Sequence, residues 1–163
     1  MTVTKQGSKA RLLIQLVITA AMTALLLAAA QSIGRSAHDN YQTPQWAVII
    51  HLFTVIPALP LGAFVLASKK GDARHRLLGK IWALMMLITA IVSFWIRDIT
   101  GQIGPIHVFS VVTLISIPLA LYYIRRGNVL AHRRAMVGPY IGIIVAGAFA
   151  LTPGRMLGSM VFG

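Results

Sequence analysis

The pentapeptide His51-Leu-Phe-Thr-Val55 recurs further along the chain as His107-Val-Phe-Ser-Val111. Both copies read His-x-Phe-(Thr/Ser)-Val, and each opens an apolar run of membrane-spanning length. This recurrence indicates a repeated unit of about 56 residues.

A short basic motif follows each of these histidines, 18 residues on. It is Lys69-Lys70-Gly71-Asp72 in the first copy and Arg125-Arg126-Gly127-Asn128 in the second. Each motif leads to a His-Arg pair, His75-Arg76 in the first copy and His132-Arg133 in the second. An arginine, Arg97 or Arg155, then follows each pair.

These motifs predict a single membrane domain with two parallel two-helix repeats. The domain covers residues 1–163, with an extra first helix at 12–33, repeat one at 46–97 and repeat two at 103–155.

The composition indicates that lipid, and not water, surrounds most of the chain. Of the 163 residues, 57% are apolar and 11% are charged, which leaves too little polar surface for a soluble fold. The net charge of +12 would suggest nucleic acid as the partner of a soluble protein. Here the cations flank apolar runs, so membrane lipids are the expected partners and nucleic acid is not. Because the chain has no cysteine, disulfides and thiolate metal sites are excluded.

Five apolar runs predict an all-α integral membrane protein with five transmembrane helices. The runs cover residues 12–33, 46–68, 77–97, 105–123 and 136–153. The first run resembles a secretory signal at its start, but it is longer than the usual apolar core of about 7–15 residues. We interpret it as a retained helix, with a cleaved signal as the alternative.

The distribution of lysine and arginine predicts the orientation. Twelve of the 15 basic residues lie on one side of the predicted membrane, and Arg35, Arg97 and Arg155 lie on the other. Because cytoplasmic loops carry the excess of Lys and Arg, this bias predicts a multi-pass membrane protein with a cytoplasmic N-terminus.

This topology places four histidines in two layers. His51 and His107 lie near the outer ends of two parallel spans, and His75 and His132 lie at the inner ends of the other two. A pseudo-two-fold axis along the membrane normal would bring each pair face to face. Because span three becomes apolar only at residue 77, ligation by His75 requires the helix to begin near Ala73.

Paired imidazoles in a helical bundle suit a haem, because two neutral histidines supply both axial ligands of its iron. The sequence therefore predicts one or two b-type haems, with metal ligands His51, His107, His75 and His132. Haem propionates need cationic partners near the membrane edge. Those predicted are Arg97, Arg155, Arg76 and Arg133.

The chain resembles a family of small bacterial predicted membrane proteins that is named only as a domain of unknown function. The resemblance covers residues 47–155 and rests on His51, His75-Arg76-x-x-Gly79 and His132-Arg133-Arg134-Ala-Met136. The chain has Ala135 where a tryptophan is frequent in that family.

The four layered histidines are also similar in architecture to the two-haem transmembrane cytochromes b that move electrons from ascorbate. In that group each haem lies between alternate helices, which implies here the pairs His51 with His107 and His75 with His132. An electron carrier with a quinol or another small reductant as partner follows from the analogy.

Other interpretations stay open. Histidines near helix ends also bind headgroups or carbonyl oxygens, above all His75 and His132 in their basic loops. A zinc or copper site at the outer pair lacks the usual Cys, Met or carboxylate companions. The competing functional class is a non-catalytic membrane subunit or assembly factor without haem. Assembly as a homodimer or in a larger membrane complex is equally compatible with the sequence.

The topology is testable with single cysteines, because the chain has none of its own. Cysteines at Asp72 and Asn128 should react with impermeant thiol reagents only from the inner side, and one at Gln102 only from the outer side. Labelling of positions 72 and 102 from the same side would reject both the topology and the two histidine layers.

Overall fold

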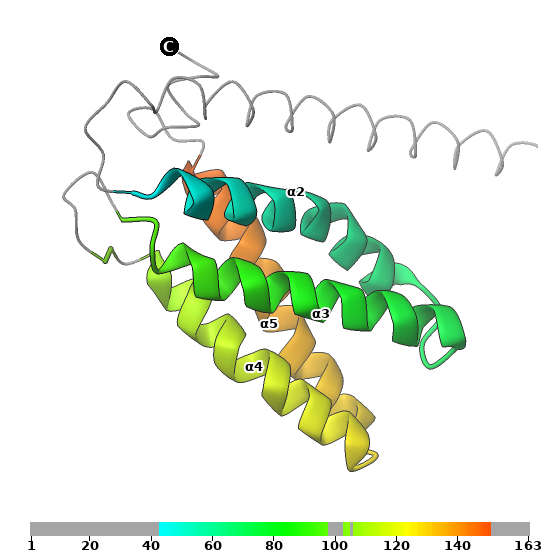
Figure 1. Cartoon of the computed structure of the whole chain (residues 1–163). Coiled ribbons are helices and arrows are strands. Elements are labelled where there is room, and N and C mark those ends of the chain that lie inside the picture. The colour runs from blue at the N-terminus through cyan, green and yellow to red at the C-terminus, as the bar shows by residue number, and fades with distance from the viewer. Residues whose placement is uncertain (1–42, 98–102, 105, 151–163) are drawn as a thin grey trace, which may run out of the picture.

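Four α-helices make up the part of the computed structural model that is described here, residues 43–97, 103–104 and 106–150 (Figure 1). They are α2 (Gln45–Ala67), α3 (Ala73–Ser93), α4 (His107–Arg125) and α5 (Val129–Ala150), and the same residues contain no strand. The predicted extra helix at 12–33 and the predicted ligand Arg155 lie outside these residues.

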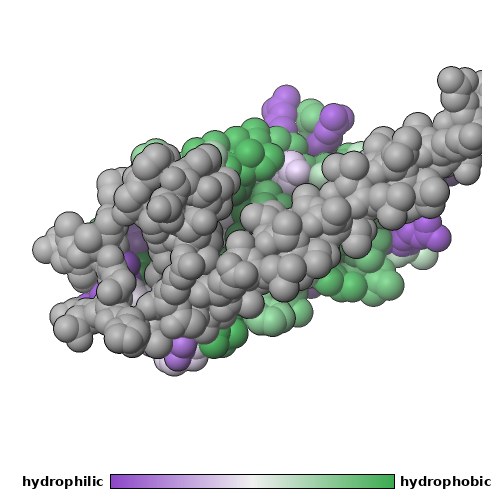
Figure 2. Space-filling model, turned by 90° about the horizontal axis from the view of Figure 1, so that it is seen from above, coloured by the Kyte–Doolittle hydropathy of each residue, from purple (hydrophilic) through white to green (hydrophobic). Residues whose placement is uncertain are grey.

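Three of these helices, α2, α3 and α4, are long and apolar enough to cross a membrane. Their apolar side chains face outward as well as inward. Phe53, Leu84 and Ile115 are among the exposed ones. In Figure 2 apolar residues cover most of the described surface in view, with the hydrophilic ones toward its margins. An apolar exterior of this kind is expected of a protein solvated by lipid.

The helices form two hairpins, α2 with α3 and α4 with α5, which meet where α3 packs on α4 and α2 on α5. Figure 1 shows that the hairpins converge at the end where α2 and α4 begin and diverge toward their tips. The tips are the turns 68–72 and 126–128, predicted to lie at the inner membrane face. Despite this divergence, all four helices contribute to one buried apolar cluster.

Trp82 of α3 lies at the centre of the apolar core. Its side chain is 2% exposed, and its Nε1 donates a 2.9 Å hydrogen bond to the Ala58 carbonyl oxygen of α2. A Cβ added at Gly62 would lie 2.5 Å from that indole nitrogen and 2.7 Å from the Tyr140 ring of α5. Gly62 thus allows α2 to approach side chains of two other helices. The rest of the buried cluster comprises Ala83, Met86, Ile117, Ala120, Met136 and Ile143.

The two hairpin turns share one backbone feature, a glycine with a positive φ angle. Gly71 and Gly127 have φ angles of +81° and +74°, in the left-handed region that favours glycine. The residue after each glycine caps the next helix, because Asp72 Oδ1 accepts the His75 N–H at 2.6 Å and Asn128 Oδ1 accepts the Ala131 N–H at 3.0 Å.

These caps explain why α3 and α5 begin before their apolar runs, at residues 73 and 129 instead of the predicted 77 and 136. A capped first turn satisfies its own N–H groups, so it needs no apolar residues. The early start of α3 also places His75 on a helix, as ligation would require.

Replacing the turn glycines tests the shared turn geometry. Gly71→Ala and Gly127→Ala should each lower the free energy of unfolding by about 1 kcal/mol, because a Cβ disfavours positive φ. Unfolding in mixed detergent micelles measures this difference. The matched control is Gly138→Ala on an open face of α5, where alanine should leave stability unchanged or raise it. Equal effects at all three positions would contradict the proposed role of the turns.

Candidate functional site

The buried polar side chains of the described residues gather at the converging end of the bundle. They are Thr89 and Ser93 in the last turns of α3, and His107 and Thr113 in the first turns of α4. The apolar core around Trp82 lies deeper, toward the hairpin tips. The protein therefore has a polar layer at the end that the sequence predicts to be outside.

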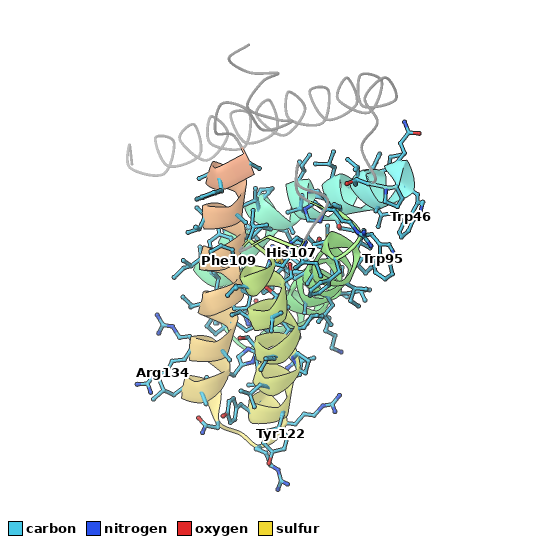
Figure 3. All side chains as sticks on the ribbon, turned by 90° about the vertical axis from the view of Figure 1, so that its left-hand side faces the viewer. Trp46, Trp95, His107, Phe109, Tyr122 and Arg134 are labelled. Carbon is cyan, nitrogen blue, oxygen red and sulfur yellow. The ribbon has the colours of Figure 1, made fainter. Side chains whose placement is uncertain are left out.

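His107 ties the start of α4 to the end of α3. Its Nδ1 lies 3.0 Å from the Gly104 carbonyl oxygen, its Nε2 lies 3.1 Å from the Ser93 carbonyl oxygen, and its ring packs beside Phe94 at 5.7 Å between centroids. Figure 3 shows His107 among the helices at the first turn of α4. A neutral imidazole carries one N–H, so it can donate to only one of these two carbonyls.

Two pairs of hydroxyl groups extend the polar layer across three helices. The Thr89 hydroxyl of α3 donates to Thr54 Oγ1 of α2 at 2.6 Å. The Ser93 and Ser110 hydroxyls, from α3 and α4, lie 2.7 Å apart. Thr54 and Ser110 occupy the Thr/Ser position of the repeated motif, but the repeat predicted neither their hydroxyl pairs nor the partners Thr89 and Ser93. The signal that would have found them is that each lies within four residues, one helical turn, of a predicted outer histidine or of another member of the layer.

His51 of α2 completes the layer and differs from every other member. Its ring hydrogen-bonds the backbone of Thr89 and interacts electrostatically with His107, the other predicted outer ligand. Its Nδ1 is buried without a hydrogen-bond partner and is the one such side-chain atom in the described part of the chain. Leaving a buried polar atom unsatisfied costs about 1–3 kcal/mol, so this nitrogen is the unexplained atom of the layer.

The predicted inner histidines each bond within their own hairpin. His75 Nδ1 lies 3.5 Å from the Ser68 hydroxyl at the end of α2, and His132 Nδ1 lies 2.9 Å from the Ala120 carbonyl oxygen of α4. Since the hairpin tips diverge (Figure 1), no contact among the described residues joins these two rings. The pairing of His75 with His132 remains a prediction.

The predicted propionate partners are exposed where the structure describes them. Arg97 follows α3, and its backbone N–H donates to Thr43 Oγ1 at 3.2 Å. Arg76 donates from Nη1 to the Gly71 carbonyl oxygen at 3.1 Å, which ties it to the turn. Arg133 lies on the surface of α5 near the opposite hairpin tip. Only Arg97 therefore lies near the polar layer.

Two glycines, Gly62 and Gly79, show how much space the bundle leaves for a planar cofactor. The small-residue gap at Gly62 is filled by Trp82 and Tyr140, so a macrocycle does not fit there. Gly79 has one neighbour near its missing Cβ, Val65 at 3.8 Å. No group of three or more His, Cys, Asp or Glu gathers among the described residues.

A family model described as "Predicted membrane protein (DUF2306)" matches residues 48–160, which include all four layered histidines. No curated protein and no solved structure matches the chain.

The two outer histidines should differ in their response to replacement by leucine. In protein prepared without added haem, His107→Leu should lower the free energy of unfolding by about 1–3 kcal/mol, because the α3–α4 connection loses the one hydrogen bond that the buried imidazole donates. His51→Leu should lower it less, because loss of the hydrogen bond to the Thr89 backbone is offset by removal of an unsatisfied buried nitrogen. Unfolding in detergent measures both. An equal or larger loss for His51→Leu would indicate that Nδ1 has a protein partner and would remove the case for a ligand.

Proposed function

The chain belongs to the DUF2306 family of predicted membrane proteins, and we propose that it is a b-type haem protein that carries electrons within or across the bilayer. The observation that carries this proposal is the buried, unpartnered His51 Nδ1, whose ring also interacts electrostatically with His107. Two imidazoles in the same polar layer of a bundle, one of them short of a partner, could together hold one haem iron.

The surroundings of His107 favour ligation by its Nε2. Metal-binding histidines generally donate the other ring N–H to a carbonyl or a carboxylate, which fixes the tautomer and the ring orientation. The Gly104 carbonyl oxygen lies 3.0 Å from Nδ1 and can play this part. Nε2 would then exchange its contact with the Ser93 carbonyl for the metal.

The polar layer suits the chemistry that haem supplies, which is the gain and loss of one electron at iron. Its hydroxyls are satisfied by one another and by helix carbonyls, as in the 2.8 Å bond from Thr54 to the Ile50 carbonyl oxygen. Such a layer holds the histidines in place. Arg97, predicted to lie on the outer side, is the propionate partner nearest to it.

The proposal favours one haem at the outer pair. A second haem at His75 and His132 would require the diverging hairpin tips to approach each other. His132 nevertheless keeps its Nε2 available, since Nδ1 is engaged by the Ala120 carbonyl. A quinol or another small reductant is the proposed electron donor, and the bacterial inner membrane with a cytoplasmic N-terminus is the proposed location.

The competing proposal is a membrane subunit or assembly factor without haem, and it has support of its own. His107 bridges two carbonyls at the α3–α4 connection, and His132 bonds α5 to α4. Both contacts are what structural histidines make. This alternative leaves the unpartnered His51 Nδ1 unexplained, which is why we rank it second.

Visible spectra of the purified protein, expressed with ample haem supply, test the proposal. The wild type should show a Soret band that shifts on reduction by dithionite. His51→Ala and His107→Ala should each abolish the same spectral component, and the double variant should lose little more, because the two ligands act as a unit.

The controls are the neighbours Phe53→Ala and Val108→Ala. Both side chains are exposed, at 66% and 60%, so both variants should keep the spectrum of the wild type. A wild-type protein without a Soret band would end the haem proposal. Loss of the band in the control variants as well would point to general destabilisation and not to ligation.

A further inference from the structure

One face of α3 combines two cations with a long apolar stripe. At 100° per residue, Arg74 and Lys80 flank a strip that carries Leu77, Ile81 and Leu84. These three apolar side chains are 60%, 43% and 60% exposed. Ile91, 48% exposed, continues the strip toward the far end of the helix. The face thus has charge at the hairpin tip and hydrocarbon along the rest of its length.

The cations at this tip outnumber the acids that could neutralise them. Asp72 is the one carboxylate among the described residues, and its Oδ1 is used to cap α3. Lys70 donates to the Val65 and Ser68 carbonyl oxygens at 3.3 and 2.9 Å, and Arg76 donates to Gly71. Arg74 and Lys80 are both exposed and have no hydrogen-bond or ionic partner within the described ranges.

We propose that this face of α3, Arg74 and Lys80 with Leu77, Ile81 and Leu84, binds an anionic phospholipid of the predicted inner leaflet. The phosphate of the lipid lies between the two cations, which attract it by charge. One acyl chain lies along the leucine and isoleucine strip. The long stems of arginine and lysine let both cations reach the headgroup level while their helix stays in hydrocarbon.

The apolar strip decides between a lipid and a soluble anion. A free phosphate would need only the two cations, whereas exposed side chains below them match an acyl chain. A second protein helix would also fit an apolar strip, but it would not account for two unpartnered cations at the headgroup end. An anionic phospholipid accounts for both parts of the face, because its phosphate would bind the two cations and its acyl chain would cover the apolar strip.

Native mass spectrometry of the full chain in detergent, with added phosphatidylglycerol or phosphatidylcholine, tests this proposal. The wild type should retain phosphatidylglycerol in a saturable one-to-one complex and retain phosphatidylcholine at least fivefold less. R74Q/K80Q should reduce the retention of phosphatidylglycerol at least fivefold. L77N should weaken it without changing the charge. Millimolar inorganic phosphate should not displace the lipid.

The matched control is R125Q/R126Q, which removes the same charge at the other hairpin tip, where Arg126 stacks on Tyr122 at 5.5 Å. This variant should keep the bound lipid, and the conservative R74K/K80R should keep it too. Equal losses in R125Q/R126Q and R74Q/K80Q would show a general charge effect and reject the site. Unchanged thermal midpoints in all variants exclude misfolding as the cause. If inorganic phosphate displaced the lipid, the ligand of this face would be a soluble anion, and the lipid proposal would be rejected.

Discussion

In the hydrocarbon core of a membrane there is no water to hydrogen-bond a polar group, so each polar group must form its hydrogen bonds within the protein. The arrangement of this bundle follows from that constraint. Trp82 reaches the Ala58 carbonyl, Thr89 reaches Thr54, and Ser93 reaches Ser110, each across a helix boundary. The first two bonds hold α3 to α2 within one hairpin, and the third joins this hairpin to α4 of the other. His51 differs from these residues, because its Nδ1 is buried and has no hydrogen-bond partner, whereas the neighbouring hydroxyl groups are hydrogen-bonded.

Because the hairpins converge at only one end, the outer and the inner histidines have different surroundings. The outer histidines lie at the end where α3 packs on α4, and they interact electrostatically across the hairpins. The inner histidines hydrogen-bond within their own hairpins, whose tips diverge (Figure 1). The two copies of the sequence repeat therefore place their histidines in different surroundings.

Much of the fold could be predicted from the sequence. Apolar runs located α2 and α4 to within a few residues, since hydropathy reports the solvent directly. The starts of α3 and α5 were predicted too late, because their first turns depend on the caps Asp72 and Asn128 and not on hydrophobicity. Predictions for residues 12–33 and for Arg155 fall outside the described residues.

The candidate site was only partly accessible from the sequence. The repeat predicts that His51 and His107 pair, and the structure places both in one polar layer, where they interact electrostatically. The hydroxyl pairs were missed, because serine and threonine in a membrane helix bond their own backbone as readily as another helix. The filling of the gap at Gly62 by Trp82 and Tyr140 was also missed, since a glycine in the sequence does not show which neighbour uses its space.

The packing around Gly62 has a consequence for the electrical insulation of the membrane. A polar layer inside a bundle can bind water, and an unbroken chain of water molecules through the bundle would conduct protons across the bilayer. Trp82, Met86 and Ile117 close the bundle on the inner side of that layer with side chains no more than 3% exposed. Side chains packed in this way exclude water, so a chain of water molecules could not continue from the polar layer past Gly62. The tryptophan that fills the space at this glycine therefore helps to keep the bundle impermeable to hydrated ions.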